Sequence, residues 1–367
     1  MYNRTPIKIQ SYKGEYEVRF SETVDPILGS FSEKSFLVID SNVDRLYPDI
    51  SRSYCNSDIF VIEPSEQSKS LEQCQKLMSK LVENGFKKGQ KLIAVGGGVV
   101  QDIVAFVSSV LYRGVEWTFV PTTLLAQADS CVGSKTSINF QNVKNLLGSF
   151  HPPSRIYCCI EFLNTLDKED IKSGIGEILH YYLISDHKSA QQMMKEYNNI
   201  LQKPSLIREH IAKSLMIKKK MVEKDEFDQR ERRVFNYGHT FGHALEAISE
   251  FDINHGQAVT MGMDIANFIS FKAGNIKLNT YNSLCKTLEK NIPQFLLHSR
   301  EDVDKYISFL MKDKKNIKPN MLTCILLFES PNESVPVKPE VCSIEIGRIG
   351  KMITEYFEDR NGQFCQK

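Results

Sequence analysis

The chain of 367 residues lacks the features that define several large classes of protein. It has no apolar run of about eighteen residues, so we expect no membrane span. Its first residues, Met-Tyr-Asn-Arg-Thr-Pro, include no apolar signal core. The formal net charge is only +1, without the basic field of a nucleic-acid-binding protein or an acidic tail. These absences predict a cytoplasmic protein that binds neither membrane nor nucleic acid.

The cysteines give no sign of a disulfide framework. There are nine, an odd number, and no Cys-x-x-Cys pair occurs. Paired spacings would be required for a disulfide scaffold or a cysteine zinc site, so we expect buried thiols in a reducing compartment. What the chain does have is length and an apolar content of 41%, enough for two domains of ordinary size.

Short apolar runs alternate with helical spacing in the first 165 residues. The runs predict strands at 35–40, 58–62, 91–95, 116–120 and 155–160. Helical spacing covers 71–84 and 99–111. Strands that alternate with helices predict a parallel sheet with right-handed crossovers, which is an α/β doubly wound, Rossmann-like domain.

Helical periodicity dominates the rest of the chain. It predicts helices up to 184 and at 187–200, 205–224, 239–248 and 256–273, with one strand-like run at 322–328. We therefore predict an α/β domain over residues 1–163 and a mostly α-helical domain over 164–367. The tail after about residue 330 is rich in loop-forming residues and supports no further prediction.

The triplet Gly96-Gly97-Gly98 stands between a predicted strand and a predicted helix. Glycines let the backbone approach a pyrophosphate, and the helix that follows presents free N–H groups and the positive end of its dipole. Asp40 ends an earlier strand, where a carboxylate can accept a hydrogen bond from a ribose hydroxyl. The triplet is not the Gly-x-Gly-x-x-Gly fingerprint, so a turn needed only for tight packing is the alternative.

Two histidines, His239 and His243, stand four residues apart and would share one face of a helix. Imidazole commonly binds zinc, and His255 could add a third ligand. The glycines beside His239 would leave room for a ligand or for a second backbone. Glu177 is an acid in an apolar helical stretch and needs a partner if it is buried. That partner is either a metal ion held with His239 and His255 or a lysine.

A polar cluster follows Pro121-Thr122-Thr123, which ends a predicted strand. It contains Asp129, Lys135, Lys144 and Asn145 in a segment with little helical or strand pattern. Such groups suit a hydroxylated, phosphorylated substrate, since lysine is a point-charge partner for phosphate. Each residue alone is better explained as an ordinary surface residue. The density of the cluster, next to Pro121-Thr122-Thr123, is what favours a site.

Taken together, these motifs resemble the 3-dehydroquinate synthase family of sugar-phosphate cyclases. The resemblance runs from about Val38 to Asp313. It depends on ordered motifs, namely Gly-Gly-Gly-Val-Val-Gln-Asp102, Arg113-Gly, Pro-Thr-Thr-Leu-Leu-Ala-Gln-Ala-Asp129, Val-Gly-Ser-Lys135, Lys144-Asn145-Leu, Gly-Ile-Gly-Glu177 and Asn236-Tyr-Gly-His-Thr-Phe-Gly-His243.

The resemblance implies a homodimer that uses NAD and one divalent metal ion, zinc or cobalt. It places NAD on the first domain, and metal and substrate on the second. The implied metal ligands are Glu177, His239 and His255. The matching cofactor-side positions are Asp40, Asn42, Glu66, Lys69, Gly97, Gly98, Asp102, Thr122, Thr123, Asp129 and Lys144. The matching catalytic, substrate-side positions are Arg113, Lys135, Asn145, Lys218, Arg232, Asn236 and His243. Arg113 is expected to reach into the other subunit's site, and Lys314 or Lys315 to add a phosphate contact.

The implied substrate is a small phosphorylated sugar acid, and the implied reaction is redox-neutral overall. NAD⁺ oxidises a ring hydroxyl to a ketone, and phosphate is then eliminated. NADH reduces the ketone back to the alcohol, and after ring opening an intramolecular aldol step closes a carbocycle. A lysine and an arginine facing the substrate, Lys218 and Arg232, suit a carboxylate. They favour 3-deoxy-arabino-heptulosonate 7-phosphate and hence the shikimate route to aromatic amino acids.

Three residues depart from the family pattern. His180 stands where a substrate-facing lysine is expected, and Gln101 and Ser134 each replace a glycine. The alternatives are therefore a specialised cyclase acting on an amino analogue, sedoheptulose 7-phosphate or another sugar phosphate, and a metal-dependent polyol dehydrogenase. A further hypothesis makes His180 an additional metal ligand. The retained Glu177, His239 and His255 argue against an inactive binding protein.

Overall fold

The computed structural model describes residues 5–29, 35–141, 143–250, 252–297, 299–312, 318–332 and 335–364. The chain divides into two compact units. The first comprises Met1–Asp167 and Lys203–Gln229, and the second comprises Lys168–Gln202 and Arg230–Lys367. The change of unit after Asp167 lies close to the boundary predicted at 163/164. The structure departs from the predicted division at Lys203–Gln229, which groups with the first unit.

A seven-stranded sheet forms the centre of the first unit, in the order β1-β2-β9-β6-β5-β3-β4. Its strands are β1 (Ile7–Ser11), β2 (Gly14–Ser21), β3 (Ser35–Asp40), β4 (Ile59–Ile62), β5 (Lys91–Gly96), β6 (Trp117–Pro121) and β9 (Arg155–Cys159). The five strands predicted from apolar runs are all present and pair in parallel, as predicted. The sequence analysis missed the hairpin β1–β2, whose second strand pairs with β9.

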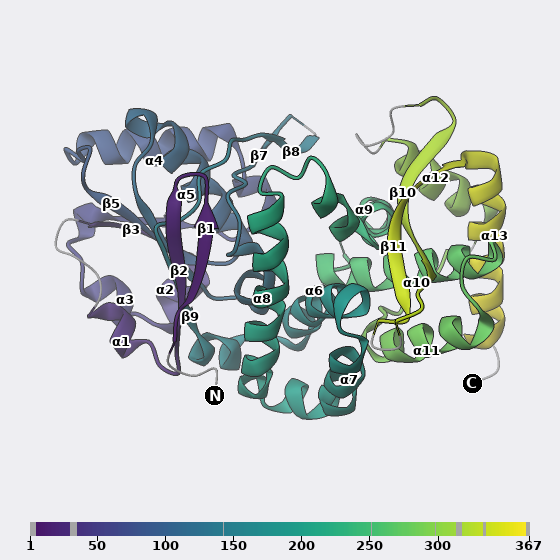
Figure 1. The fold of residues 1–367 in the computed structure, drawn as a ribbon. Coiled ribbons are helices and arrows are strands. Elements are labelled where there is room, and N and C mark those ends of the chain that lie inside the picture. Colours follow the sequence, from purple (N-terminus) through teal and green to yellow (C-terminus); the bar gives the residue numbers. More distant parts are fainter. Residues whose placement is uncertain are drawn as a thin grey trace. The chain divides into compact units, whose positions relative to one another are not determined.

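Helices cover both faces of this sheet (Figure 1). Alternate residues of β3 and β5, such as Leu37 and Val95, pack against the helices α1, α2 and α3 in one apolar cluster. α4 and α5 lie on the other side of the sheet in Figure 1. The helices of this unit are α1 (Asp25–Leu28), α2 (Ser41–Leu46), α3 (Asp49–Arg52), α4 (Leu71–Glu83), α5 (Gly98–Val110) and α8 (Arg208–Lys224). This two-sided covering is the predicted doubly wound arrangement.

The polar segment after β6 is more regular than its sequence suggests. It forms a π-helical turn, Ala126–Ser130, and a small hairpin of β7 (Ile138–Phe140) and β8 (Val143–Leu147). Gln101 of α5 supports the turn, since its Nε2 donates to Ser130 O at 2.7 Å. α8 also packs here, where Ser214 Oγ donates to Ala128 O at 2.9 Å. These contacts attach α8 to the first unit.

The second unit is built around α10 (His255–Lys272). Every α10 residue from Gly256 to Ser270 is buried, which is typical of a helix surrounded by others. The remaining elements are α6 (Lys168–Ser185), α7 (His187–Gln202), α9 (His239–Ile248), α11 (Leu278–Leu288), α12 (Arg300–Met311), β10 (Met321–Glu329), β11 (Val337–Glu345) and α13 (Ile346–Phe364). The unit is mostly helical, as predicted. Within the described part of the chain, no helix is both long and apolar enough to cross a membrane.

The tail after residue 330 is structured, contrary to its loop-rich appearance. β11 pairs along its whole length with β10 (Figure 1), and α13 follows. Asp264, buried on α10, anchors α13 by accepting from Tyr356 Oη at 2.7 Å and Arg360 Nη2 at 2.6 Å. The sequence analysis could not predict this, because the helix depends on a carboxylate about ninety residues earlier.

Candidate metal centre and cofactor-binding residues

Three helices of the second unit bring Glu177, His239 and His255 together. Nε2 of His239 lies 3.5 Å from Glu177 Oε1, and Nε2 of His255 lies 3.3 Å from the same oxygen. One ligand atom of each residue lies within 4.8 Å of the others. The Glu177 side chain is only 2% exposed. Its Oε1 makes no hydrogen bond of regular geometry among the described residues. One carboxylate and two imidazoles with an acceptor left over fit a zinc-like cation.

Glycines beside these three candidate ligands allow the helices to approach one another. A Cβ on Gly256 would lie 1.8 Å from Ser173 O, and one on Gly176 would lie 2.0 Å from Gly256 O. Next to His239, Gly238 has a φ of +78°, and a Cβ there would lie 2.9 Å from Val259 O and 3.0 Å from Met263 N, both backbone atoms of α10. Of the two explanations for the glycines flanking His239, a second backbone is therefore the one observed at Gly238. The approach of α6 to α10 places Glu177 next to His255.

A second set of contacts orients the two imidazoles. Nδ1 of His239 lies 3.2 Å from Tyr237 O, and Nδ1 of His255 lies 3.1 Å from Glu246 Oε2. Burial would lower the pKa of His255, but Glu246 and Glu177 raise that pKa well above its ordinary value. A metal ion would therefore have to displace a proton from this imidazole.

His243 and His180 lie beside the three residues without completing their cluster. The ring of His243 lies 5.6 Å from that of His239, and His243 is exposed. His180 is 1% exposed, with its Nδ1 3.8 Å from Glu177 Oε2. Among the described residues, neither group of candidate ligands includes His180. The candidate groups therefore lend no support to His180 as an additional ligand, and its ring lies against those of Tyr181, Phe235 and Tyr237.

Two predicted substrate residues precede α9, in the 3₁₀ segment Glu231–Asn236. Arg232 is buried. Asn236 Nδ2 donates to Arg233 O at 2.9 Å, which ties the side chain to its own turn. The predicted phosphate contacts Lys314 and Lys315 lie outside the described residues.

In the first unit, a polar network joins several predicted cofactor residues. Lys69 Nζ lies 2.8 Å from Asp102 Oδ2 and 3.5 Å from Glu66 Oε1, and donates to Asn145 Oδ1 at 3.0 Å. Burial would lower the pKa of Lys69, but Asp102 and Glu66 raise it above its ordinary value, so the ammonium stays charged. Asn139 links the network to the β7–β8 hairpin, because its Nδ2 donates to Glu66 Oε1 at 2.8 Å.

The structure gives two glycines of the triplet different surroundings. A Cβ on Gly97 would lie 2.9 Å from Thr123 Cγ2, whereas one on Gly98 would meet nothing within 4 Å. Gly97 is therefore required for packing, and Gly98 begins α5 beside open space. The N–H groups at this helix start lie at the carboxyl edge of the parallel sheet, where an anionic cofactor binds in such folds.

Asp40 is buried at the end of β3 and caps α2. Its Oδ1 accepts from Asn42 N at 2.8 Å and from Val43 N at 3.3 Å. Capping α2 is therefore a structural role for the Asp40 carboxylate, and it occupies one of the two carboxylate oxygens. The predicted contact with a ribose hydroxyl did not take this role into account. Thr122 adds a further link at this edge, where its N–H donates to Gly96 O at 3.0 Å.

The remaining predicted residues lie in four places. Lys218 of α8 donates to both Asp129 O and Asp129 Oδ1 at 2.7 Å, which joins a predicted substrate residue to a predicted cofactor residue. Lys135 forms an ion pair with Asp228, and Lys144 is exposed on β8. Arg113 is exposed in a tight turn, with a φ of +64°.

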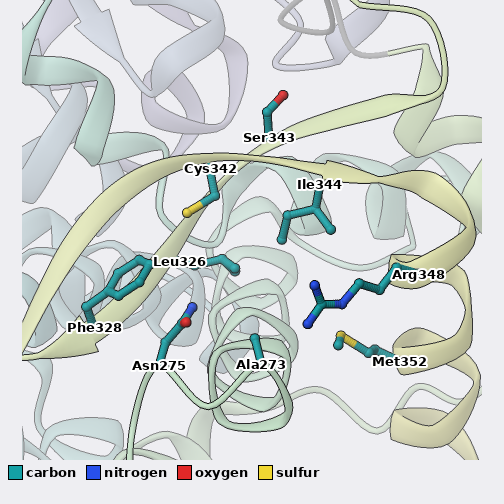
Figure 2. A pocket seen from close by; sticks show the side chains of 9 residues that line it. All are labelled: Ala273, Asn275, Leu326, Phe328, Cys342, Ser343, Ile344, Arg348 and Met352. Carbon is teal, nitrogen blue, oxygen red and sulfur yellow. The ribbon is translucent and has the colours of Figure 1, made fainter.

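A separate cavity of about 290 Å³ opens in the second unit, between the β10–β11 hairpin, α13 and the end of α10. Figure 2 shows its lining side chains, which include Phe328, Cys342 and Arg348. None of its lining residues was predicted to belong to a site, and the cavity adds nothing to the metal centre.

Sequence reasoning missed Glu246, the partner of His255. It stands seven residues after His239 and three after His243 on the same helix, so the three share a face. An acid in the otherwise apolar stretch after His243 was the available signal.

Comparison with known families agrees with this architecture. Residues 59–173 match the family described as 3-dehydroquinate synthase N-terminal, and residues 174–316 match the one described as 3-dehydroquinate synthase C-terminal. A 3-dehydroquinate synthase from Clostridium tetani is 35% identical over 340 residues, which is 89% of this chain and 90% of that protein.

Solved structures of related cyclases share the fold. A 2-deoxy-scyllo-inosose synthase, in complex with carbaglucose-6-phosphate, NAD⁺ and Co²⁺, superposes with a TM-score of 0.83 at 22% identity, over 96% of this chain and 99% of the other. A 2-epi-5-epi-valiolone synthase from Streptomyces hygroscopicus, with NAD⁺ and Zn²⁺ bound, gives 0.79 at 21% identity, over 94% and 97%.

Proposed function

The chain belongs to the 3-dehydroquinate synthase family, and on this basis we propose that it converts 3-deoxy-arabino-heptulosonate 7-phosphate to 3-dehydroquinate and phosphate. The observation that carries the proposal is the cluster of Glu177, His239 and His255, in a chain that also has Lys135, Lys218 and Arg232 at positions resembling the family's substrate side. It would be a phosphate-eliminating lyase that uses NAD and a divalent cation.

The bound cation would stabilise the alkoxide of the hydroxyl that NAD⁺ oxidises. The residues of the chain would do the rest by position and charge. Glu177, His239 and His255 would hold the cation. Gly98 and the start of α5 would receive the NAD pyrophosphate, and Lys69 would bring a positive charge to the same edge of the sheet.

On the substrate, Lys135, Lys218, Arg232 and Asn236 would bind the phosphate, carboxylate and hydroxyl groups. Arg232 is suited to a carboxylate, because a guanidinium can engage both oxygens. The imidazole of His243 would form a hydrogen bond with a substrate oxygen. Asn145 is the last of the residues proposed to bind the substrate.

We further propose a homodimer in the cytoplasm, in which Arg113 completes the site of the other subunit. Its exposure at the tip of a tight turn supports this role. The eight cysteines of the described residues are free thiols, which suits a reducing compartment. A molar mass of one chain in light scattering would contradict the dimer.

Substrate choice is tested by phosphate release from the purified protein with NAD⁺ and Zn²⁺. The three substrates are 3-deoxy-arabino-heptulosonate 7-phosphate, sedoheptulose 7-phosphate and glucose 6-phosphate. We expect release from the first alone, because a lysine and an arginine at Lys218 and Arg232 suit a substrate carboxylate, which the other two sugar phosphates lack. Release from either of the others would contradict the proposal and favour a specialised cyclase, whose selectivity would then trace to the departure at His180.

A further inference from the structure

We propose that Glu246 is a positioning residue of the metal centre, which holds the imidazole of His255 with its Nε2 turned toward Glu177. The inference rests on the proposed function insofar as that function requires a cation at Glu177, His239 and His255. Glu246 would act through His255 and would not touch the metal ion itself.

The two nitrogens of His255 face two different carboxylates. Nδ1 lies 3.1 Å from Glu246 Oε2, and Nε2 lies 3.3 Å from Glu177 Oε1. A carboxylate beside Nδ1 favours the tautomer with the proton on that nitrogen, and this leaves the lone pair of Nε2 free for a cation. The negative partner also raises the basicity of the ring and hence its strength as a ligand.

His255 needs such a partner more than His239 does. It is the first residue of α10, and its side chain is 34% exposed, against 16% for His239. Packing therefore restrains His255 less. His239 is oriented by a backbone oxygen, Tyr237 O, which carries no charge. Glu246, by contrast, offers a carboxylate that is only 12% exposed, so it can fix the more loosely packed ligand.

A second metal site is the competing explanation, since His243, Glu246 and His255 also bring ligand atoms within 4.8 Å of one another. Two observations favour positioning instead. His243 is exposed, and Glu246 lies within hydrogen-bond distance of the His255 nitrogen that faces away from Glu177. The number of ions bound per chain separates the two explanations.

The test compares the variants E246A and E246Q with the wild-type chain. The affinity for Zn²⁺ and Co²⁺ is measured by competition with a chelator, and the visible spectrum of bound Co²⁺ reports the ligand geometry. We expect E246A to bind each ion about 10- to 100-fold more weakly, with an altered Co²⁺ spectrum. E246Q should lose less, because its amide oxygen can still accept from Nδ1–H. The matched control is E250Q, at an exposed glutamate four residues further on.

Three results would overturn the inference. Wild-type affinity and an unchanged spectrum in both E246A and E246Q would do so. If the metal-free variants were less stable but the folded variants bound Zn²⁺ and Co²⁺ with unchanged affinity, Glu246 would have only a structural role. If the wild-type chain bound two metal ions and the E246A chain only one, Glu246 would be a ligand of a second metal site. Failure of the wild-type chain to bind any ion would instead contradict the proposed function.

Discussion

The variant G256A is expected to lose both stability and metal binding. A methyl group at residue 256 would lie 1.8 Å from Ser173 O and 2.6 Å from Ser173 C, both backbone atoms that no rotamer change can move. Overpacking a core costs about 1–3 kcal/mol where side chains can adjust, so we expect a loss of more than about 3 kcal/mol here. Since α6 must then shift from α10, Glu177 would separate from His255.

Urea unfolding and metal content measure the two effects together. The control is G347A on α13, where the nearest atom to an added Cβ is Glu345 Oε1 at 3.9 Å. That change should be neutral, or stabilising by up to about 1 kcal/mol through helix propensity. If G256A unfolds at the same urea concentration as the wild-type chain and keeps its metal ion, the two helices are not held as closely as described.

Replacing Glu177 by glutamine should abolish metal binding while leaving the helices in place. The amide has nearly the shape of the carboxylate, but it carries no charge and is a poor ligand for a zinc-like cation. The loss of activity should be nearly complete, because His239 and His255 alone provide only two ligands.

Metal-linked stability gives a readout of E177Q that does not depend on activity. An ion supplied at about 100 times its dissociation constant stabilises a folded protein by about 2.7 kcal/mol. We expect added Zn²⁺ to raise the unfolding temperature of the wild-type chain and to have no such effect on E177Q. The control E169Q changes a half-exposed glutamate on the same helix and should respond like the wild type. A wild-type response from E177Q would exclude Glu177 as a ligand.

Sequence reasoning predicted those features that depend on local periodicity or on motif order. The apolar runs predicted β3, β5, β6 and β9 because strands buried on both faces are apolar nearly throughout. The run of β4 is equally apolar, although β4 is an edge strand and its Val61 is exposed. Likewise, ordered motifs brought Glu177, His239 and His255 together as a ligand set, although the three residues come from separate helices.

Other features depend on contacts that periodicity does not specify. The pattern of α8 indicated a helix, but not that Ser214 and Lys218 would bind the π-helical turn of the first unit. A buried apolar face can pack on either unit. Glu246 was missed for a related reason: its role depends on His255, which belongs to the next helix. Asp40 was expected to contact ribose, and its helix cap was visible only in the structure.

The most direct test of a cyclase built on this metal centre is the amount of phosphate released per NAD⁺, with NAD⁺ supplied far below the substrate concentration. We expect phosphate release to continue until the sugar phosphate is consumed, without accumulation of NADH, because each turnover returns the hydride to the product. Accumulation of NADH in step with substrate loss, with the phosphate still attached to the sugar, would contradict this and identify a dehydrogenase.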